Sequence, residues 1–411
     1  MSLKQTDGAI YGLVEKELDY QKKTLRLIAS ENYTSTAVME ATGSIFTNKY
    51  AEGYPNKRYY AGNRYVDEME TLAIERAKAL FKVGHANVQP HSGSSANIGA
   101  FFAFLEVGDK FMGLDLPHGG HLTHGSQVNF SGKWFKAVPY TVSKETEALD
   151  YDAIRKTALE EKPKLIICGY TAYPLIIDFK AFREICDEVG AVMMADISHI
   201  AGLIAGEAYP SPAPHSDVIT TTTHKTLRGP RGAIMMGPEE NAKKIDKAIF
   251  PGMQGGPLEN VIAAKAVCFH EAMQPEFKEY AAQIVKNAKV LAEELVANGL
   301  RLVAGKTETH LVLVDLTPKG ITGKDAQMAL EESGLITNRN TIPFDTRSPF
   351  ITSGLRLGTA AVTTRGMGES EMKEIASMIV KVVENPNDSE LKLKTRSGIE
   401  ELCNRFPVYE N

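Results

Sequence analysis

The sequence has few cysteines, no excess of positive charge and no long apolar run. Its four cysteines are Cys168, Cys186, Cys268 and Cys403, and no two form a C-x-x-C pair. This argues against a disulfide framework or a cysteine metal site and predicts reduced thiols in a cytoplasmic protein. The net charge is −5, so nothing indicates nucleic acid or an anionic membrane as a partner. No apolar run of about eighteen residues predicts a membrane span, and the first residues, M-S-L-K-Q-T-D, lack a secretory apolar region.

What remains is an ordinary globular composition, with 43% hydrophobic and 24% charged residues in a chain of 411. Short apolar runs separated by helical patterns between 151 and 240 predict an α/β fold with a mostly parallel sheet covered on both faces. We expect an N-terminal arm and subunit-contact segment at 1–80, a large domain at 81–278 and a smaller α+β domain at 279–411. In the last, H-L-V-L-V-D-L predicts a strand, and the apolar spacing from Met372 to Val382 predicts a final helix ending before Pro386.

One stretch organises the rest: D-V-I-T-T-T-T-H-K-T-L-R-G-P-R-G, residues 217–232. Its β-branched start predicts a strand, and Lys225 follows just beyond the strand end. A neutral lysine amine is a nucleophile toward carbonyl carbons, and Arg228 and Arg231 nearby would favour the neutral form. Taken alone, the same pattern is also typical of a solvated surface lysine.

Two further signals fall at the carboxyl ends of predicted strands or the starts of helices. Asp196 ends the strand A-V-M-M-A-D and is soon followed by His199, which places both where α/β sheets collect ligands. The segment S-G-S-S predicts a helix beginning near Ser94 or Ser95. Such a helix start is either a phosphate site or an ordinary N-cap.

Histidine and arginine add two candidates. His118, His121 and His124 recur at three-residue intervals, but Gly119-Gly120 between them favours a loop, so an imidazole stacked on a planar ligand is preferred to a metal site. Arg356 lies in an apolar strand between glycines. A buried arginine needs a carboxylate, either from the protein or from a substrate.

A tyrosine-rich loop covers residues 48–62, N-K-Y-A-E-G-Y-P-N-K-R-Y-Y-A-G. Its glycines and proline predict a loop, and its composition is typical of a binding surface or of a well-ordered structural loop.

One cofactor accounts for these separate signals. Pyridoxal 5'-phosphate requires a lysine for its Schiff base and an aspartate beside its pyridinium nitrogen. Its phosphate suits a helix start, and an arginine would bind the carboxylate of an amino-acid substrate.

With these motifs in view, nearly the whole chain resembles the serine hydroxymethyltransferase family, which has the aspartate-aminotransferase-like fold (fold type I). The resemblance rests on L-I-A-S-E-N-Y, N-K-Y-A-E-G-Y-P-x-K-R-Y-Y, V-Q-P-H-S-G-S, H-G-G-H-L-T-H-G, A-D-I-x-H-I-A-G, T-T-T-T-H-K-T-L-R-G-P-R-G and F-P-G-x-Q-G-G-P. It implies reversible transfer of the serine hydroxymethyl carbon to tetrahydrofolate, leaving glycine. It also implies pyridoxal phosphate as cofactor and no metal.

The resemblance assigns roles residue by residue. Lys225 is the Schiff-base lysine, Asp196 the pyridinium partner, His121 the ring-stacking imidazole and Glu52 the proton carrier near the substrate hydroxyl. The other implied contacts are Ser92, Gly93, Ser94, His199, His224, Gly255 and Gly256 for the cofactor, Ser30, Tyr50, Tyr60 and Arg356 for the substrate, and Leu116, Gly120, Leu122 and Asn340 for the folate.

The family also implies an obligate homodimer, which either stands alone or associates into a tetramer. Each active site of the dimer takes five residues from the neighbouring subunit: Tyr50, Glu52, Tyr60, Gly255 and Gly256. Departures from the usual family pattern are Ser95, Thr171, Ser198, Asn260 and Ala360.

Two alternatives stay open at this point. One is a folate-independent aldolase for β-hydroxy amino acids such as threonine or α-methylserine, against which the Glu52 loop and Asn340 argue. The other is a cofactor-binding or RNA-binding regulator on the same fold, against which Lys225, Asp196 and Arg356 together argue.

Overall fold

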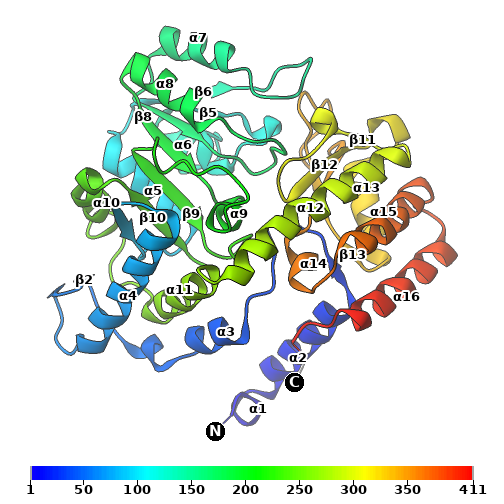
Figure 1. Cartoon of the computed structure of the whole chain (residues 1–411), viewed down its shortest axis with the longest axis horizontal. Helices are drawn as coiled ribbons and strands as arrows, with labels where there is room; N and C mark the ends of the chain where they lie inside the picture. The colour runs from blue at the N-terminus through cyan, green and yellow to red at the C-terminus, as the bar shows by residue number, and fades with distance from the viewer. Residues whose placement is uncertain (1, 410–411) are drawn as a thin grey trace.

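The apolar runs of the middle of the chain form neighbouring strands of one sheet in the computed structural model, which describes residues 2–409 (Figure 1). Within these residues the sheet has seven strands, in the order β4 (His85–Asn87), β10 (Ala233–Gly237), β9 (Val218–Thr222), β8 (Val192–Asp196), β7 (Leu165–Cys168), β5 (Lys110–Leu114) and β6 (Lys136–Tyr140). The strands from β9 to β6 pair in parallel, whereas β10 is antiparallel to β9 and β4. The mostly parallel sheet is confirmed. The G-A-I-M-M run is its exception, because the R-G-P-R-G turn brings the chain straight back beside β9.

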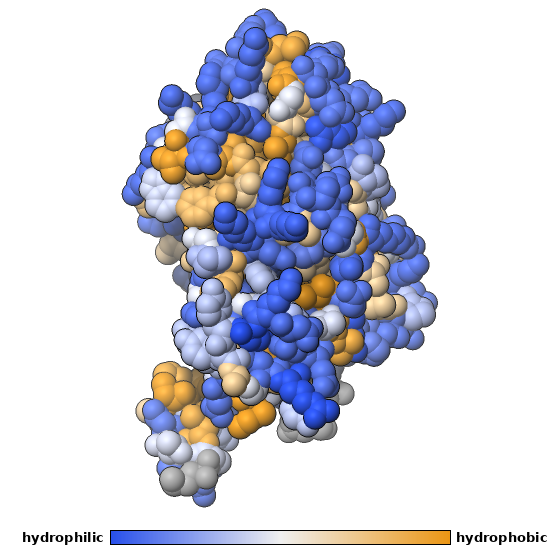
Figure 2. Space-filling view, turned by 90° about the vertical axis from the view of Figure 1, so that its left-hand side faces the viewer, coloured by the Kyte–Doolittle hydropathy of each residue, from blue (hydrophilic) through white to orange (hydrophobic). Residues whose placement is uncertain are grey.

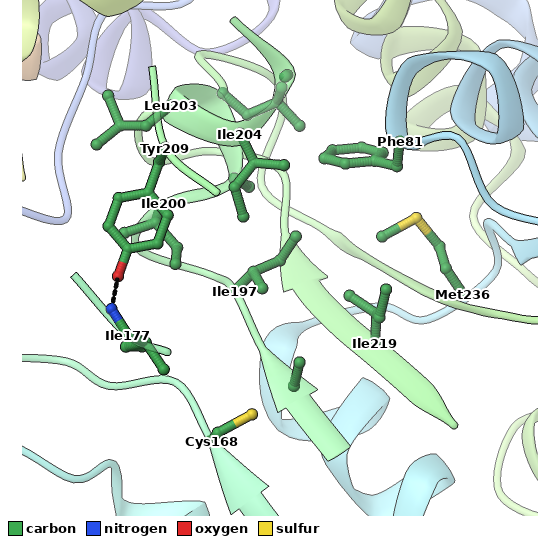
Figure 3. Packing of buried hydrophobic residues seen from close by; sticks show 14 of the residues in the cluster. Phe81, Cys168, Ile177, Ile197, Ile200, Leu203, Ile204, Tyr209, Ile219 and Met236 are labelled. Carbon is green, nitrogen blue, oxygen red and sulfur yellow. Dashed lines mark hydrogen bonds between the residues drawn. The ribbon is translucent and has the colours of Figure 1, made fainter. Parts of the chain in front are cut away.

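Helices cover both faces of this sheet, because successive strand residues point to opposite sides. On one face, α5 (Gly93–Phe104) and α10 (Ala242–Ile249) enclose a core that includes Met194 and Val218. On the other, α4 (Arg64–Phe81), α8 (Phe179–Val189) and α11 (Glu259–Ala272) enclose the core that contains Met193 and Ile219. Figure 3 shows part of this second core, where the amide of Ile177 donates to the Tyr209 hydroxyl at 2.7 Å.

A second, antiparallel sheet lies in the C-terminal part of the chain. Its order is β11 (Arg301–Leu302), β12 (Leu311–Asp315), β15 (Gly354–Gly358) and β14 (Asn338–Asn340). The predicted strand H-L-V-L-V-D-L is β12, and Arg356 lies in β15. Two helices pack here, α13 (Gly323–Glu332) and α15 (Glu369–Glu384). The helix predicted to be the last is α15. That prediction was wrong, because Asp388 caps a further helix, α16 (Ser389–Arg405).

The long helix α12 (Pro275–Ala297) joins the two cores (Figure 1). Its first half contributes Phe277 and Ile284 to the large core, and its second half contributes Leu291 and Leu295 to the small one. The predicted boundary at 278 falls inside this helix, and the three-part division of the chain stays a prediction.

The N-terminal segment contributes buried side chains to both cores. α2 (Gly8–Lys23) buries none of its residues, and the short strand β1 (Leu25–Arg26) then pairs with β13 (Leu335–Ile336) beside the small core. Further on, Val38 of α3 (Thr36–Thr42) packs into the large core. The hairpin β2 (Gly53–Tyr54) and β3 (Lys57–Arg58) lies in the tyrosine-rich loop.

The remaining helices are short or peripheral. They are α1 (Leu3–Thr6), α6 (Phe130–Trp134), α7 (Tyr151–Glu161), α9 (Ala201–Ala205) and α14 (Ala360–Thr364). Across residues 2–409, we find no helix with both the length and the apolar character required to cross a bilayer.

Phe101 tests the packing of α5 onto the sheet. Its fully buried ring lies edge-on to Phe111 and Phe135, with centroids 4.8 and 4.9 Å away. Phe101→Ala should lower the free energy of unfolding by about 3–5 kcal/mol through lost burial and a residual cavity. The matched control is Phe102→Ala, whose ring is 39% exposed and should cost about 1 kcal/mol. Urea unfolding followed by circular dichroism measures both, and equal losses would contradict the packing.

Candidate active site

Lys225 lies in a cavity of about 330 Å³ at the carboxyl ends of β8 and β9. Burial lowers the pKa of its amine to about 8, with contributions from Arg356 and Arg231, while Asp196 acts in the opposite direction. With that pKa, roughly a tenth of the amine is neutral at pH 7. Arg228 does not take the predicted part, because its guanidinium lies over the Tyr280 ring, 4.6 Å from the centroid.

The loop that carries Lys225 is held from the N-terminal segment. Asn32 donates to the carbonyl of Lys225 at 2.9 Å and to the hydroxyl of Tyr280 at 2.7 Å. Its own oxygen accepts from Thr364 of α14 at 2.7 Å. Asn32 thereby connects the backbone of the lysine loop to the N-terminal segment and to α14.

Asp196 faces the same cavity and is surrounded by donors. Oδ2 accepts from Asn97 at 2.9 Å and lies 3.1 Å from Nε2 of His124. Oδ1 accepts from the amide of Ser198 at 3.1 Å and from its hydroxyl at 2.6 Å. Burial opposes the charge, but the hydrogen bonds from His124 and Asn97 outweigh it and hold the pKa of Asp196 well below its usual range. The carboxylate is therefore an anion throughout the physiological range.

The S-G-S-S segment forms the start of α5 at the rim of the cavity. The helix begins at Gly93, slightly before the predicted Ser94 or Ser95, because Ser92 is the N-cap and accepts from the Ser95 amide at 3.2 Å. Gly93 is closely packed, since a Cβ there would lie 2.7 Å from the Thr222 methyl. Within residues 2–409, the amides of Gly93 and Ser94 have no acceptor, which leaves them for an anion.

The three spaced histidines separate into different environments. His121 lies in the cavity, where burial lowers its pKa to about 4 and leaves the ring neutral. His124 reaches Asp196, while His118 packs against Phe344 with ring centroids 4.7 Å apart. Two short turns divide the three side chains, so they share no face. In the described part of the chain, no group of three or more potential metal ligands gathers anywhere.

His199 and His224 line the cavity as predicted. Burial lowers the pKa of His224 to about 3 and that of His199 well below its usual range. His199 Nδ1 lies 3.2 Å from Nε2 of His310, which precedes β12, and the two rings are stacked. This contact joins the large and small cores with two uncharged rings.

Arg356 lies in β15 of the small sheet and is 7% exposed, beside the Lys225 cavity but not in its lining. Nη1 donates to the carbonyl of Thr171 at 2.9 Å, and Nε donates to Asn338 at 3.2 Å. Burial lowers its pKa to about 10, and its charge lowers the pKa values of Lys225, His121 and His199. No carboxylate among residues 2–409 pairs with it, and Ser30 lies in the adjoining cavity wall.

Five of the predicted residues do not line the Lys225 cavity but gather in what we call the tyrosine-loop cluster: Tyr50, Glu52, Tyr60, Gly255 and Gly256. Tyr50 donates to Glu52 at 3.3 Å and lies edge-on to Tyr60 at 5.0 Å. A Cβ on Gly255 would lie 2.9 Å from Glu52, and one on Gly256 would lie 3.3 Å from the Tyr50 ring. Glu52 is half-buried and accepts from Tyr50, so the carboxylate already has a hydrogen-bond partner within its own chain.

The residues predicted to contact folate lie in two parts of the chain, the segment after β5 and the strand β14. Leu116 and Leu122 are 40% and 45% exposed, and Leu116 borders a second cavity that shares His121 and His124 with the first. Gly120 has a packing reason, because a Cβ there would lie 2.0 Å from the carbonyl oxygen of Leu114. Asn340 lies in β14 of the small sheet and donates to the Thr341 carbonyl at 2.7 Å.

Sequence reasoning missed several of these side chains. Asn97 lies one helical turn beyond the recognised S-G-S-S start, and that spacing was a usable signal. Asn32 lies in the L-I-A-S-E-N-Y motif, and the polar second half of that motif was a usable signal. His310 stood in the strand run H-L-V-L-V-D-L, and nothing local distinguished it from a residue at a strand edge.

The buried His310 predicts an acid-dependent loss of stability. Burial lowers its pKa to about 3 in the folded chain, whereas an unfolded histidine binds a proton near pH 6.5. Its contribution is complete above that value and is lost as the pH falls toward 3. His310→Gln should reduce the pH dependence of the unfolding free energy between pH 6 and 4 by up to about 1.4 kcal/mol per pH unit. Urea unfolding at stepped pH measures it, exposed His270→Gln is the control, and an unchanged slope in His310→Gln would contradict the assignment.

Comparison with known proteins agrees with this geometry. The family model described as serine hydroxymethyltransferase matches residues 3–379. Serine hydroxymethyltransferases of Prochlorococcus marinus strains AS9601 and MIT 9312 are each 57% identical over 410 residues, covering 100% of this chain and 97% of each relative. The chain therefore belongs to the serine hydroxymethyltransferase family.

Proposed function

We propose that this chain transfers the hydroxymethyl carbon of serine to tetrahydrofolate, leaving glycine, with pyridoxal 5'-phosphate as cofactor. The observation that carries the proposal is one cavity in which a partly neutral lysine amine, an anionic aspartate and the start of a helix face the same space. Membership of the family supports the same reaction.

The residues present fit the cofactor. The amides of Gly93 and Ser94 and the hydroxyl of Ser92 suit a phosphate, and Lys225 suits an aldehyde. Asp196 lines the same cavity as an anion, which suits a protonated ring nitrogen. When bound, the cofactor supplies an electron-withdrawing ring that stabilises negative charge on the substrate Cα.

Arg356 and Ser30 would bind the substrate carboxylate. Nε of the guanidinium donates to Asn338, and one N–H of Nη1 donates to the Thr171 carbonyl. Nη2 makes no hydrogen bond within residues 2–409. A buried cation with free donors is stabilised by an incoming carboxylate, which would orient serine with its Cα above the lysine.

The neutral histidines would order the cofactor without adding charge. His121 would lie against the ring face, and His199, steadied by His310, would lie near the ring hydroxyl. His224 precedes Lys225 in the chain, and its low pKa keeps its ring uncharged next to the amine.

Glu52 would hold and release the proton of the substrate hydroxyl, and Leu116, Gly120, Leu122 and Asn340 would contact the folate. We infer that Glu52 acts in the neighbouring subunit of an obligate homodimer, together with Tyr50, Tyr60, Gly255 and Gly256. The tyrosine-loop cluster supports this, because its members lie with one another and outside the Lys225 cavity of their own chain.

The surface of the arm also supports association. Leu3, Ile10, Leu13 and Val14 are between 47% and 59% exposed on α1 and α2. Figure 2 shows apolar side chains on the helical end that projects at the bottom of the molecule. Four free, buried cysteine thiols are consistent with the cytoplasmic location that we propose.

Serine cleavage assayed with and without tetrahydrofolate tests the reaction. The full chain loaded with pyridoxal phosphate should convert serine to glycine with tetrahydrofolate and lose nearly all of that rate without it. Lys225→Ala should still fold, as judged by circular dichroism, and should lose the visible absorption of lysine-bound cofactor. Equal serine cleavage in both conditions would contradict the folate requirement and favour a folate-independent aldolase.

Mixing two inactive variants tests the shared site. Glu52→Gln should keep cofactor and serine binding but lose folate-dependent turnover. Co-expressed in equal amounts with Lys225→Ala, it should recover about a quarter of the wild-type activity, because half of the dimers are hybrids with one intact site. Co-expression of Glu52→Gln with wild-type chain is the control for assembly. No recovery in the mixture would show that Glu52 serves the Lys225 of its own chain.

A further inference from the structure

The carboxylate of Asp196 receives four hydrogen bonds from the protein. Asn97 and His124 serve Oδ2, and the amide and hydroxyl of Ser198 serve Oδ1. A carboxylate offers about four lone-pair positions. Any further donor, such as a ring N–H, must therefore share the carboxylate with donors that are already present.

Ser198 differs from the other donors in two ways. Its Oγ–Oδ1 distance of 2.6 Å is the shortest of the four, which is typical of a hydroxyl bonded to an anion. Its hydroxyl oxygen also accepts from the Thr222 amide at 3.1 Å, so its proton is directed toward Asp196. Ser198 lines the cavity at the end of β8, within the same wall as Ser92 and Lys225.

We propose that Ser198 is a positioning residue that limits how strongly Asp196 holds the ring nitrogen of the cofactor. The inference rests on the proposed function, since it assigns Asp196 to that nitrogen. The hydroxyl withdraws charge from Oδ1 and makes the carboxylate a weaker partner for a protonated ring. Residue 198 thereby sets the strength of the electron sink through Asp196.

Substitution of Ser198 by alanine removes one of the four hydrogen bonds to Asp196 and leaves the other three. In Ser198→Ala the backbone amide still donates to Oδ1, and Asn97 and His124 still hold Oδ2. The carboxylate should keep its place and become a stronger acceptor.

The test compares two ligands on the full-length protein after cofactor removal: pyridoxal 5'-phosphate, and its carbocyclic analogue with C–H in place of the ring nitrogen. Both aldehydes can bind Lys225 and both carry the phosphate. The ratio of their dissociation constants therefore isolates the interaction of Asp196 with the ring nitrogen. Ser198→Ala should raise the preference for pyridoxal phosphate over the analogue by about tenfold, and Ser198→Thr, which keeps a hydroxyl, should restore the wild-type ratio.

Ser333→Ala is the matched control, because it removes a buried hydroxyl that donates to the Ala329 carbonyl in the small domain. It should leave the ratio unchanged. A ratio in Ser198→Ala equal to that of the wild type, or affinities for both ligands that change by the same factor, would overturn the proposal. If the wild-type chain itself fails to prefer pyridoxal phosphate, the assignment of Asp196 in the proposed function fails instead.

Discussion

The site depends on keeping one buried carboxylate ionised. Asp196 is 7% exposed, and an isolated anion at that depth would take up a proton. It stays charged because donors converge on it from α5, from the turn after β5 and from its own strand end. Asn97 is itself held by Thr220 of β9 at 2.7 Å, so the network crosses from helix to sheet. The parallel sheet brings these elements to one edge, and their hydrogen bonds to the carboxylate fix their relative positions.

Around this anion, the charges that remain are few and complementary. Lys225 and Arg356 are mostly cationic, while burial and those cations lower the pKa values of His121 and His199 and keep both rings neutral. A neutral imidazole can stack or hydrogen-bond without repelling the amine. Away from the site, the buried amine of Lys265 donates to the carbonyls of Val88, Pro90 and Ala233. These hydrogen bonds connect the segment that leads to Ser92 with the start of β10.

The two cores meet at the site through polar contacts. Arg356 of the small sheet donates to Thr171 of the large part, and His310 contacts His199. Thr171 is one of the departures from the family pattern, but it contributes its backbone carbonyl, so the change of side chain leaves this contact intact. Asn260, another departure, donates to the Thr42 carbonyl at 2.8 Å, and Ser95 bonds Ser92. Ala360 begins α14, and nothing in the structure explains a preference for alanine there.

Much of this protein was readable from local sequence. Period and β-branching predicted the strands between 151 and 240 and the position of Lys225 after β9, because these features depend on neighbouring residues alone, whereas β4, β5 and β6 were not predicted. Motif resemblance identified the family and nominated the site residues. Tertiary structure decided the pKa values and the contact partners of those residues. Burial, more than the neighbouring arginines, lowers the pKa of Lys225, and Arg228 lies against an aromatic ring instead. Ser198, Asn97 and His310 gain their importance from partners distant in the chain or on another element. The tyrosine-loop cluster lies away from the Lys225 cavity of its own chain. Burial and long-range contacts depend on which parts of the folded chain pack together, and the pattern of neighbouring residues does not determine that packing.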